Sequence, residues 1–188
     1  RKYEVVHYIK KSCLLSFVPG ILVTLLISTY GYEYMNLVYK TDIGANYVVK
    51  LSVFFIFYYL LSPLWAIMQA IGKSKFLFKI NLISDIVKLT FVYFLTFIPW
   101  ISYNSLIIVL LANTIIATMI IYFHLKNQFR FKFYKDEILK VIILAILTFT
   151  FLQILKAGIN NYLLNTVILI LFFLMLSKIL KVTSLNKK

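Results

Sequence analysis

The sequence predicts an all-α transmembrane protein, a bundle of six membrane-spanning helices. Its 188 residues are 62% hydrophobic and only 14% charged, and the mean hydropathy is +0.92. Soluble domains carry about 25% charged residues, so this composition excludes an ordinary soluble fold. Six apolar stretches approach the roughly twenty residues that a helix needs to cross a bilayer. Basic residues crowd into alternate gaps between these stretches, as the positive-inside rule requires.

The six predicted spans are joined by short connections. They cover Leu14–Tyr30, Val48–Ile71, Phe76–Pro99, Leu106–Phe123, Ile138–Leu155 and Tyr162–Leu180. The gap from Gly31 to Tyr47 is the longest outer connection, and we expect a short amphipathic segment there. Gly72 to Lys75 predicts a tight turn and hence an antiparallel hairpin. The basic linker from His124 to Lys140 divides the chain into residues 1–125, with four spans, and 126–188, with the linker and two further spans.

The distribution of Lys and Arg predicts the orientation of the chain. Most of the twenty basic residues lie before the first span, around the second and fourth turns, and after the last span. Short loops rich in Lys and Arg stay in the cytoplasm, so both ends of the chain are expected inside an inner or plasma membrane. Lys40, Lys50 and Lys156 suit the outer surface, and Lys88 suits neither side. Because the chain opens on Arg1 and a hydrophilic segment instead of Met, we expect a piece of a longer protein.

Prolines and tyrosines in the spans predict local features of the helices. Pro19 and Pro63 each remove a backbone hydrogen bond and are expected to kink the first and second spans. Around Pro63, with Gln69 nearby, this produces either a simple bend or the wall of a cavity. Several tyrosines near span ends are expected to anchor the helices at the headgroup level. They are Tyr30, Tyr47, Tyr103, Tyr122 and Tyr162.

The third span carries the strongest candidate for a functional site. Asn81, Ser84, Asp85 and Lys88 are spaced by three, four and seven residues and therefore share one helical face. A charge at the bilayer centre costs roughly 2.5 to 3.5 kcal/mol, so this face should meet a cavity or another helix. Asp85 and Lys88 could form a neutral pair that locks two helices together. Alternatively, they line a water-filled lumen, where Lys88 meets an anionic substrate and Asp85 tunes its charge or carries a proton. In a third interpretation the pair lies near the cytoplasmic interface and Lys88 reaches the headgroups.

Catalytic, metal and nucleic-acid sites are not indicated by the sequence. The two histidines, His7 and His124, are far apart and give no zinc-ligand spacing, and the lone Cys13 is interpreted as a packing thiol. Asp136 and Glu137 form the one adjacent acidic pair, at a helix start, where acids complement the helix dipole. The net charge of +14 is spread over helix ends, which favours contact with membrane lipids over nucleic acid. We therefore expect no enzyme activity, no cofactor and no nucleic-acid partner.

The hairpin from Leu61 to Leu89 resembles a known family. Its sequence, LSPLWAIMQAIGKSKFLFKINLISDIVKL, is similar to a hairpin of the multidrug/oligosaccharidyl-lipid/polysaccharide flippase superfamily. In that pattern a span ends in Gln, a small residue and a Gly-Lys turn, and the next helix begins with Lys and Asn. The match is carried here by Gln69, Ala70, Gly72, Lys73, Lys79 and Asn81. The layout from about Lys10 to Lys126 looks most like the polysaccharide-exporter branch, of the O-antigen flippase and stage V sporulation protein B type.

The resemblance implies a transporter. Members have twelve or fourteen helices in two six-helix lobes around a central cavity, and this chain would supply four helices of the second lobe and two extra C-terminal helices. They flip or export an undecaprenyl-diphosphate-linked saccharide by alternating access, often with a coupling cation such as a proton or sodium. On this view Asn81, Ser84, Asp85, Lys88 and Gln69 would line the pathway for the substrate or ion.

Two other functions remain open at this point. A non-transporting membrane scaffold or assembly subunit would use the polar face of the third span only to dock helices. A polytopic glycan polymerase would need paired acids or arginines in a large outer loop, and the predicted outer connections are short.

Overall fold

The computed structural model describes residues 2–130, 135–180 and 182, and the described chain is helical almost throughout. The helices are α1 (Lys2–Tyr39), α2 (Ala45–Ala70), α3 (Ser74–Thr96), the short 3₁₀ helix η1 (Ser102–Asn104), α4 (Ser105–Phe129), α5 (Lys135–Gly158) and α6 (Tyr162–Ile179). The predicted all-α architecture with six long helices is confirmed. Residues 131–134 of the predicted basic linker lie outside the described residues.

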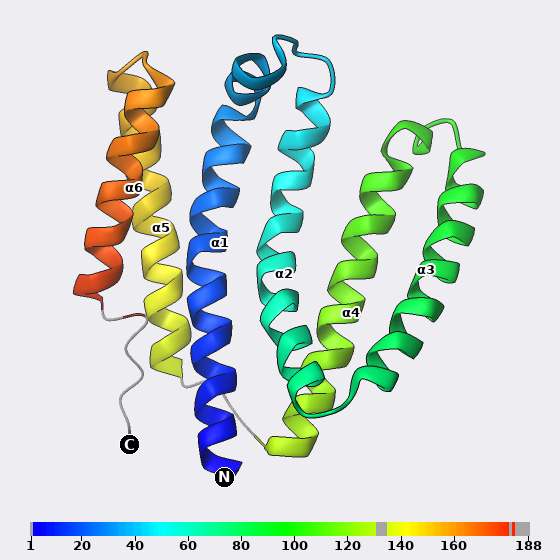
Figure 1. The fold of residues 1–188 in the computed structure, drawn as a ribbon. Coiled ribbons are helices and arrows are strands. Elements are labelled where there is room, and N and C mark those ends of the chain that lie inside the picture. Colours follow the sequence, from blue (N-terminus) through cyan, green and yellow to red (C-terminus); the bar gives the residue numbers. More distant parts are fainter. Residues whose placement is uncertain (1, 131–134, 181, 183–188) are drawn as a thin grey trace.

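The long helices stand side by side, and each runs opposite to the one before it in the sequence (Figure 1). Across the array the order is α6, α5, α1, α2, α4 and α3, because α1 packs on α2 and on the α5 and α6 pair, while α4 packs on α2 and α3. The basic gaps therefore meet at one end of the array, which we call the basic end. Lys40, Lys50 and Lys156 belong to the other end, which we call the outer end.

Five of the described helices are long and apolar enough to cross a membrane. They are Val5–Tyr39 within α1, Ala45–Ala70, Ser105–Phe129, Asp136–Gly158 within α5, and Tyr162–Ile179. The third predicted span forms its helix, α3, but does not meet the same measure of apolarity. Its 23 residues give about 34 Å of rise, enough to cross a hydrocarbon core of about 30 Å. The length expected of α3 is therefore correct, and its polar residues set it apart.

The turn between α2 and α3 is as tight as the sequence predicts. Gly72 has a φ of 77°, a conformation that glycine adopts without a Cβ clash. Its N–H donates to the carbonyl of Gln69 at 2.9 Å, and the N–H of Lys73 donates to the carbonyl of Met68 at 2.9 Å. This pair of bonds is the Schellman arrangement that closes a helix C-terminus. It returns the chain directly into α3.

The outer connection is shorter than expected because α1 continues past the predicted end of the first span. Tyr30 departs from helical geometry, with φ of −117° and ψ of 18°, and the helix resumes as far as Tyr39. The expected surface segment is thus the last part of α1, which turns across the outer end (Figure 1). Pro19 and Pro63 lie inside α1 and α2, the departure from helical backbone angles in α1 falls at Tyr30, and the bends expected at the two prolines stay predictions.

Helix packing is closest between α1 and α2. A Cβ built on Gly20 would lie 2.7 Å from the Cβ of Tyr59, and one on Gly31 would lie 2.7 Å from a methyl of Val49. Small residues let membrane helices approach and gain van der Waals contact. On its other side α1 packs through two apolar clusters against α5 and α6. One helix therefore joins the two parts into which the linker divides the sequence.

Candidate functional site: the polar face of α3

The candidate site lies at the centre of α3, which is the edge helix of the array (Figure 1). Asp85 is equally far along the helix from Ser74 and Thr96, about 16 Å of rise from each end. Lys88 lies one turn beyond this centre, farther from the basic end. This position gives no support to the interpretation in which Lys88 reaches the headgroups at the basic end.

Asp85 and Lys88 form an ion pair within α3. The Lys88 ammonium donates to a carboxylate oxygen of Asp85 at 2.6 Å. The Asp85 side chain is 59% exposed and that of Lys88 is 27% exposed. Both partners belong to one helix, so the pair itself does not lock two helices together. The expectation that the two residues pair is confirmed.

Ser84 provides the contact that joins the polar face to a neighbouring helix. Its hydroxyl donates to the side-chain oxygen of Asn113 on α4 at 2.7 Å. Asn81, one turn nearer the basic end, is half-buried like Ser84. The four predicted residues thus share one face, as the spacing indicates. Ser84 contacts α4 on one side of this face, and the side of the face that carries Asp85 is open.

The surroundings of Asp85 make its exposure chemically significant. The large side chains on the open sides of α3 are apolar and mostly exposed, and within α3 the buried residue is Leu77. The exposed ones near the centre are Leu82, Ile83, Ile86, Val87 and Leu89. In a helix that crosses the bilayer, an open carboxylate amid such residues at the helix centre is unfavourable against hydrocarbon, even when paired. Such a face favours cover by water or by polar groups of other helices.

Gln69 does not join this cluster. It is exposed at the end of α2, beside the turn at the basic end, whereas Asp85 lies half a helix length away. The side chain of Lys50 reaches outward as predicted and donates to Asn104 at 2.9 Å, which ties α2 to η1. In α4, Asn113 accepts the interhelical bond from Ser84, whereas its neighbour Thr114 donates to the carbonyl of Leu110 in its own helix.

A second polar cluster, around Asn165, is not evident from the sequence. Asn165 is 1% exposed, and its amide nitrogen donates to the hydroxyl of Tyr30 at 3.0 Å and to the carbonyl of Ile159 at 2.9 Å. Tyr34 shares a hydrogen bond of 2.6 Å with Thr166 one residue further along α6. Tyr30, expected at the headgroup level, is 3% exposed, so its predicted role as a surface anchor is wrong. The sequence feature that points to this cluster is Asn165 itself, an amide within the largely apolar last span.

An ion pair joins α1 to α5 at the basic end. Lys10 lies 3.9 Å from a carboxylate oxygen of Glu137, and both side chains are largely buried. The sequence interpretation assigned Lys10 to topology and Glu137 to the helix dipole. Two residues more than a hundred positions apart leave no pattern in the sequence that indicates their contact. The pairing follows from the packing of α5 on α1.

Comparisons of the chain with protein-family models, curated proteins and solved structures found no match. The assignment of a function therefore rests on the chemistry of the α3 face and on the sequence resemblance of the α2 and α3 hairpin.

Proposed function

We propose that this chain forms part of a membrane transporter that flips or exports a lipid-linked saccharide. The observation that supports this most is the open, ion-paired Asp85 at the centre of a membrane-length helix. Ionisable residues at such depth characteristically face water-filled pathways or each other. Transporter sites also tend to lie near the bilayer midplane. In this proposal the α3 face lines one wall of a pathway that helices outside this chain complete.

The chemistry of the pair suits an anionic substrate. The diphosphate that links a polyprenyl lipid to its saccharide would compete with Asp85 for the Lys88 ammonium. Asp85, once released, could bind a coupling proton or sodium ion, so that substrate and cation binding are linked through one broken ion pair. The undecaprenyl-diphosphate substrate and alternating access come from the resemblance of the Leu61–Leu89 hairpin. The basic end is assigned to the cytoplasm by the positive-inside rule.

Replacing Lys88 by Ala in the full-length protein tests the proposal. We expect transport of the lipid-linked saccharide to fall by about tenfold or more, the effect of losing a charged hydrogen bond worth about 1.5 to 3 kcal/mol. Protein abundance in the membrane should stay unchanged, because the ammonium contacts only its own helix among the described residues. Lys75→Ala, in the first turn of the same helix, is the matched control and should transport normally. Unchanged transport in Lys88→Ala, or loss of the protein from the membrane, would contradict the pathway assignment.

Asp85→Asn tests the coupling step separately. This variant keeps the size of the side chain and removes its charge, so a cation-driven transporter should lose its dependence on the ion gradient while still binding substrate. Export that follows the gradient as steeply in Asp85→Asn as in the unchanged protein would exclude Asp85 as the coupling residue.

A scaffold or assembly subunit is the second candidate, and the bond between Ser84 and Asn113 favours it. This bond shows that part of the polar face docks α3 on α4. In a scaffold the remaining polar groups would dock a further protein helix, and Lys88→Ala would then weaken assembly instead of transport. Co-purification of partner proteins from the Lys88→Ala and Lys75→Ala strains separates the two functions.

A further inference from the structure

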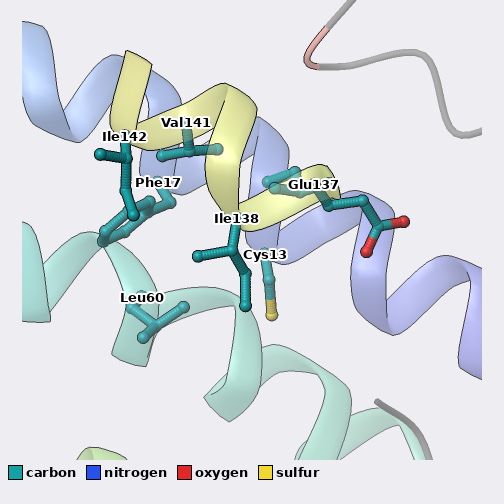
Figure 2. A pocket seen from close by; sticks show the side chains of 8 residues that line it. Cys13, Phe17, Leu60, Glu137, Ile138, Val141 and Ile142 are labelled. Carbon is teal, nitrogen blue, oxygen red and sulfur yellow. The ribbon is translucent and has the colours of Figure 1, made fainter. Parts of the chain in front are cut away.

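A cleft of about 310 Å³ lies between α1, α2 and α5 near the basic end. Cys13 and Phe17 of α1, Leu60 of α2, and Ile138, Val141 and Ile142 of α5 converge on it (Figure 2). Its volume is at the lower limit of small-molecule sites. The cleft is separate from the α3 face, because α2 and α4 lie between α1 and α3 (Figure 1).

The lining of the cleft is apolar. Glu137 also borders it, but its carboxylate turns away from the other lining side chains, and it pairs with Lys10 (Figure 2). A buried water needs two to four polar partners, and the accessible lining offers none. A hydrocarbon chain is therefore the natural occupant of this space in a membrane.

The end of the array at which the cleft lies is strongly basic. Lys11 is exposed and lies two residues before Cys13 in the sequence, and Lys140, half-buried, lies between Ile138 and Val141 in the sequence of α5. Among the described side chains of the basic end, the acids are Asp136 and Glu137, and the bases are Lys10, Lys11, Lys73, Lys75, Lys79, Lys126, Arg130, Lys140 and Lys178. Each Lys or Arg near a membrane surface contributes roughly 1 kcal/mol to the attraction of anionic lipid.

We propose that the cleft holds one acyl chain of an anionic glycerophospholipid, with its phosphate against the basic side chains of this end. The small volume suits a single unbranched chain better than a long branched isoprenoid. The charge favours phosphatidylglycerol over phosphatidylcholine. The bound lipid fills the space between α5 and the α1 and α2 pair. This inference does not depend on the proposed transport function.

The two tryptophans of the chain make a fluorescence test practicable. In a variant with Trp65 and Trp100 changed to Phe, Phe17→Trp places a single reporter of similar shape at the cleft. Phe149→Trp is the matched control on an exposed face of α5. Both proteins are reconstituted in phosphatidylcholine vesicles that contain brominated phosphatidylglycerol or brominated phosphatidylcholine, whose bromine atoms quench tryptophan on contact.

We expect brominated phosphatidylglycerol to quench the cleft reporter at about fivefold lower mole fraction than brominated phosphatidylcholine, as one Lys contact would produce. The control reporter should show no preference, and changing Lys11 and Lys140 to Gln should remove the preference at the cleft. Equal quenching by both lipids at the cleft, or no quenching there, would overturn the proposal. Displacement of brominated phosphatidylglycerol by a lower mole fraction of polyprenyl phosphate would overturn the choice of a glycerophospholipid.

Native mass spectrometry of the unsubstituted protein gives a second measurement that does not depend on the variants folding. The protein extracted from phosphatidylglycerol-containing membranes should retain about one such lipid. Val141→Phe, which fills the cleft, should retain fewer. Retention that is the same for phosphatidylcholine, or the same in Val141→Phe, would count against the site.

Discussion

Polar residues are buried on one side of the array and exposed on the other. Where α1 meets α5 and α6, Asn165 is buried and bonded to Tyr30 and to the end of α5. At the opposite edge, Asp85 of α3 is charged, open and paired only within its own helix among the described contacts. Buried amides that bond across helices add modest stability to membrane bundles. An open charge at the helix centre adds little stability and calls for another explanation.

The contrast predicts that changes on the α1 side reduce stability and changes on the α3 side reduce function. The largest effect on stability is expected for Lys10→Met at the basic end. This substitution removes one counter-charge of the largely buried Glu137, and breaking a buried ion pair costs up to about 3 kcal/mol. The free energy of unfolding, measured by steric trapping in bicelles, should fall by this amount. The charge-swapped pair Lys10→Glu with Glu137→Lys should recover much of it, and no recovery would show that the pairing is not the cause.

Asn165→Leu should have the next largest effect. The substitution keeps the volume and removes the donations to Tyr30 and Ile159, so the free energy of unfolding should fall by about 1 to 2 kcal/mol. A double-mutant cycle with Tyr30→Phe measures the share of one bond. If the two substitutions are additive, the bond between Tyr30 and Asn165 does not stabilise the fold and the break in α1 has another origin.

Asn113→Leu offers a comparison on the α3 side. The bond from Ser84 to Asn113 is half-buried, so its loss should lower the free energy of unfolding by about 0.6 kcal/mol, the average for such bonds in membranes. A loss as large as that of Asn165→Leu would mean that α3 is held to α4 as firmly as α1 is held to α6. The distinction between the two sides would then fail.

The smallest effect on stability is expected for Lys88→Gln. Open ion pairs three residues apart on a helix contribute about 0.3 to 0.5 kcal/mol. The free energy of unfolding should therefore change by less than the experimental error of most methods. A decrease of several kcal/mol would show that the Asp85 carboxylate is enclosed in the folded protein and that the pair has a structural role.

Features that arise from local sequence were predictable. The apolar stretches predicted the helices, Gly72 predicted the tight turn, and the spacing of Ser84, Asp85 and Lys88 predicted their common face. Each of these features is determined by residues that are close together in the sequence. Features that depend on tertiary packing were not. The break of α1 at Tyr30 and the bonds of Asn165 depend on how α6 sits against α1. A tyrosine near a span end has the same sequence signature whether it faces headgroups or a buried amide.

The helix α3 is long enough to cross a membrane but is less apolar than the other five long helices. The charged residues that lower its apolarity are Asp85 and Lys88 of the candidate site together with Lys75 and Lys79 near the basic end. A membrane-spanning helix needs apolar residues, whereas a binding site needs polar ones, and α3 contains both. In the proposed pathway the conflict is resolved because part of α3 faces water.

Cysteine labelling at the α3 face tests this claim most directly. With Cys13, the one cysteine of the chain, changed to Ser, single cysteines are placed at Asp85 and at Ile83 in the full-length protein. Both residues are exposed in the structure, but residues two apart on a helix point to different sides, so Ile83 lies off the polar face. A membrane-impermeant maleimide should label Asp85→Cys in intact membranes and leave Ile83→Cys unlabelled, because one faces water and the other lipid. An unreactive cysteine at position 85 would contradict the proposal that α3 lines an aqueous pathway.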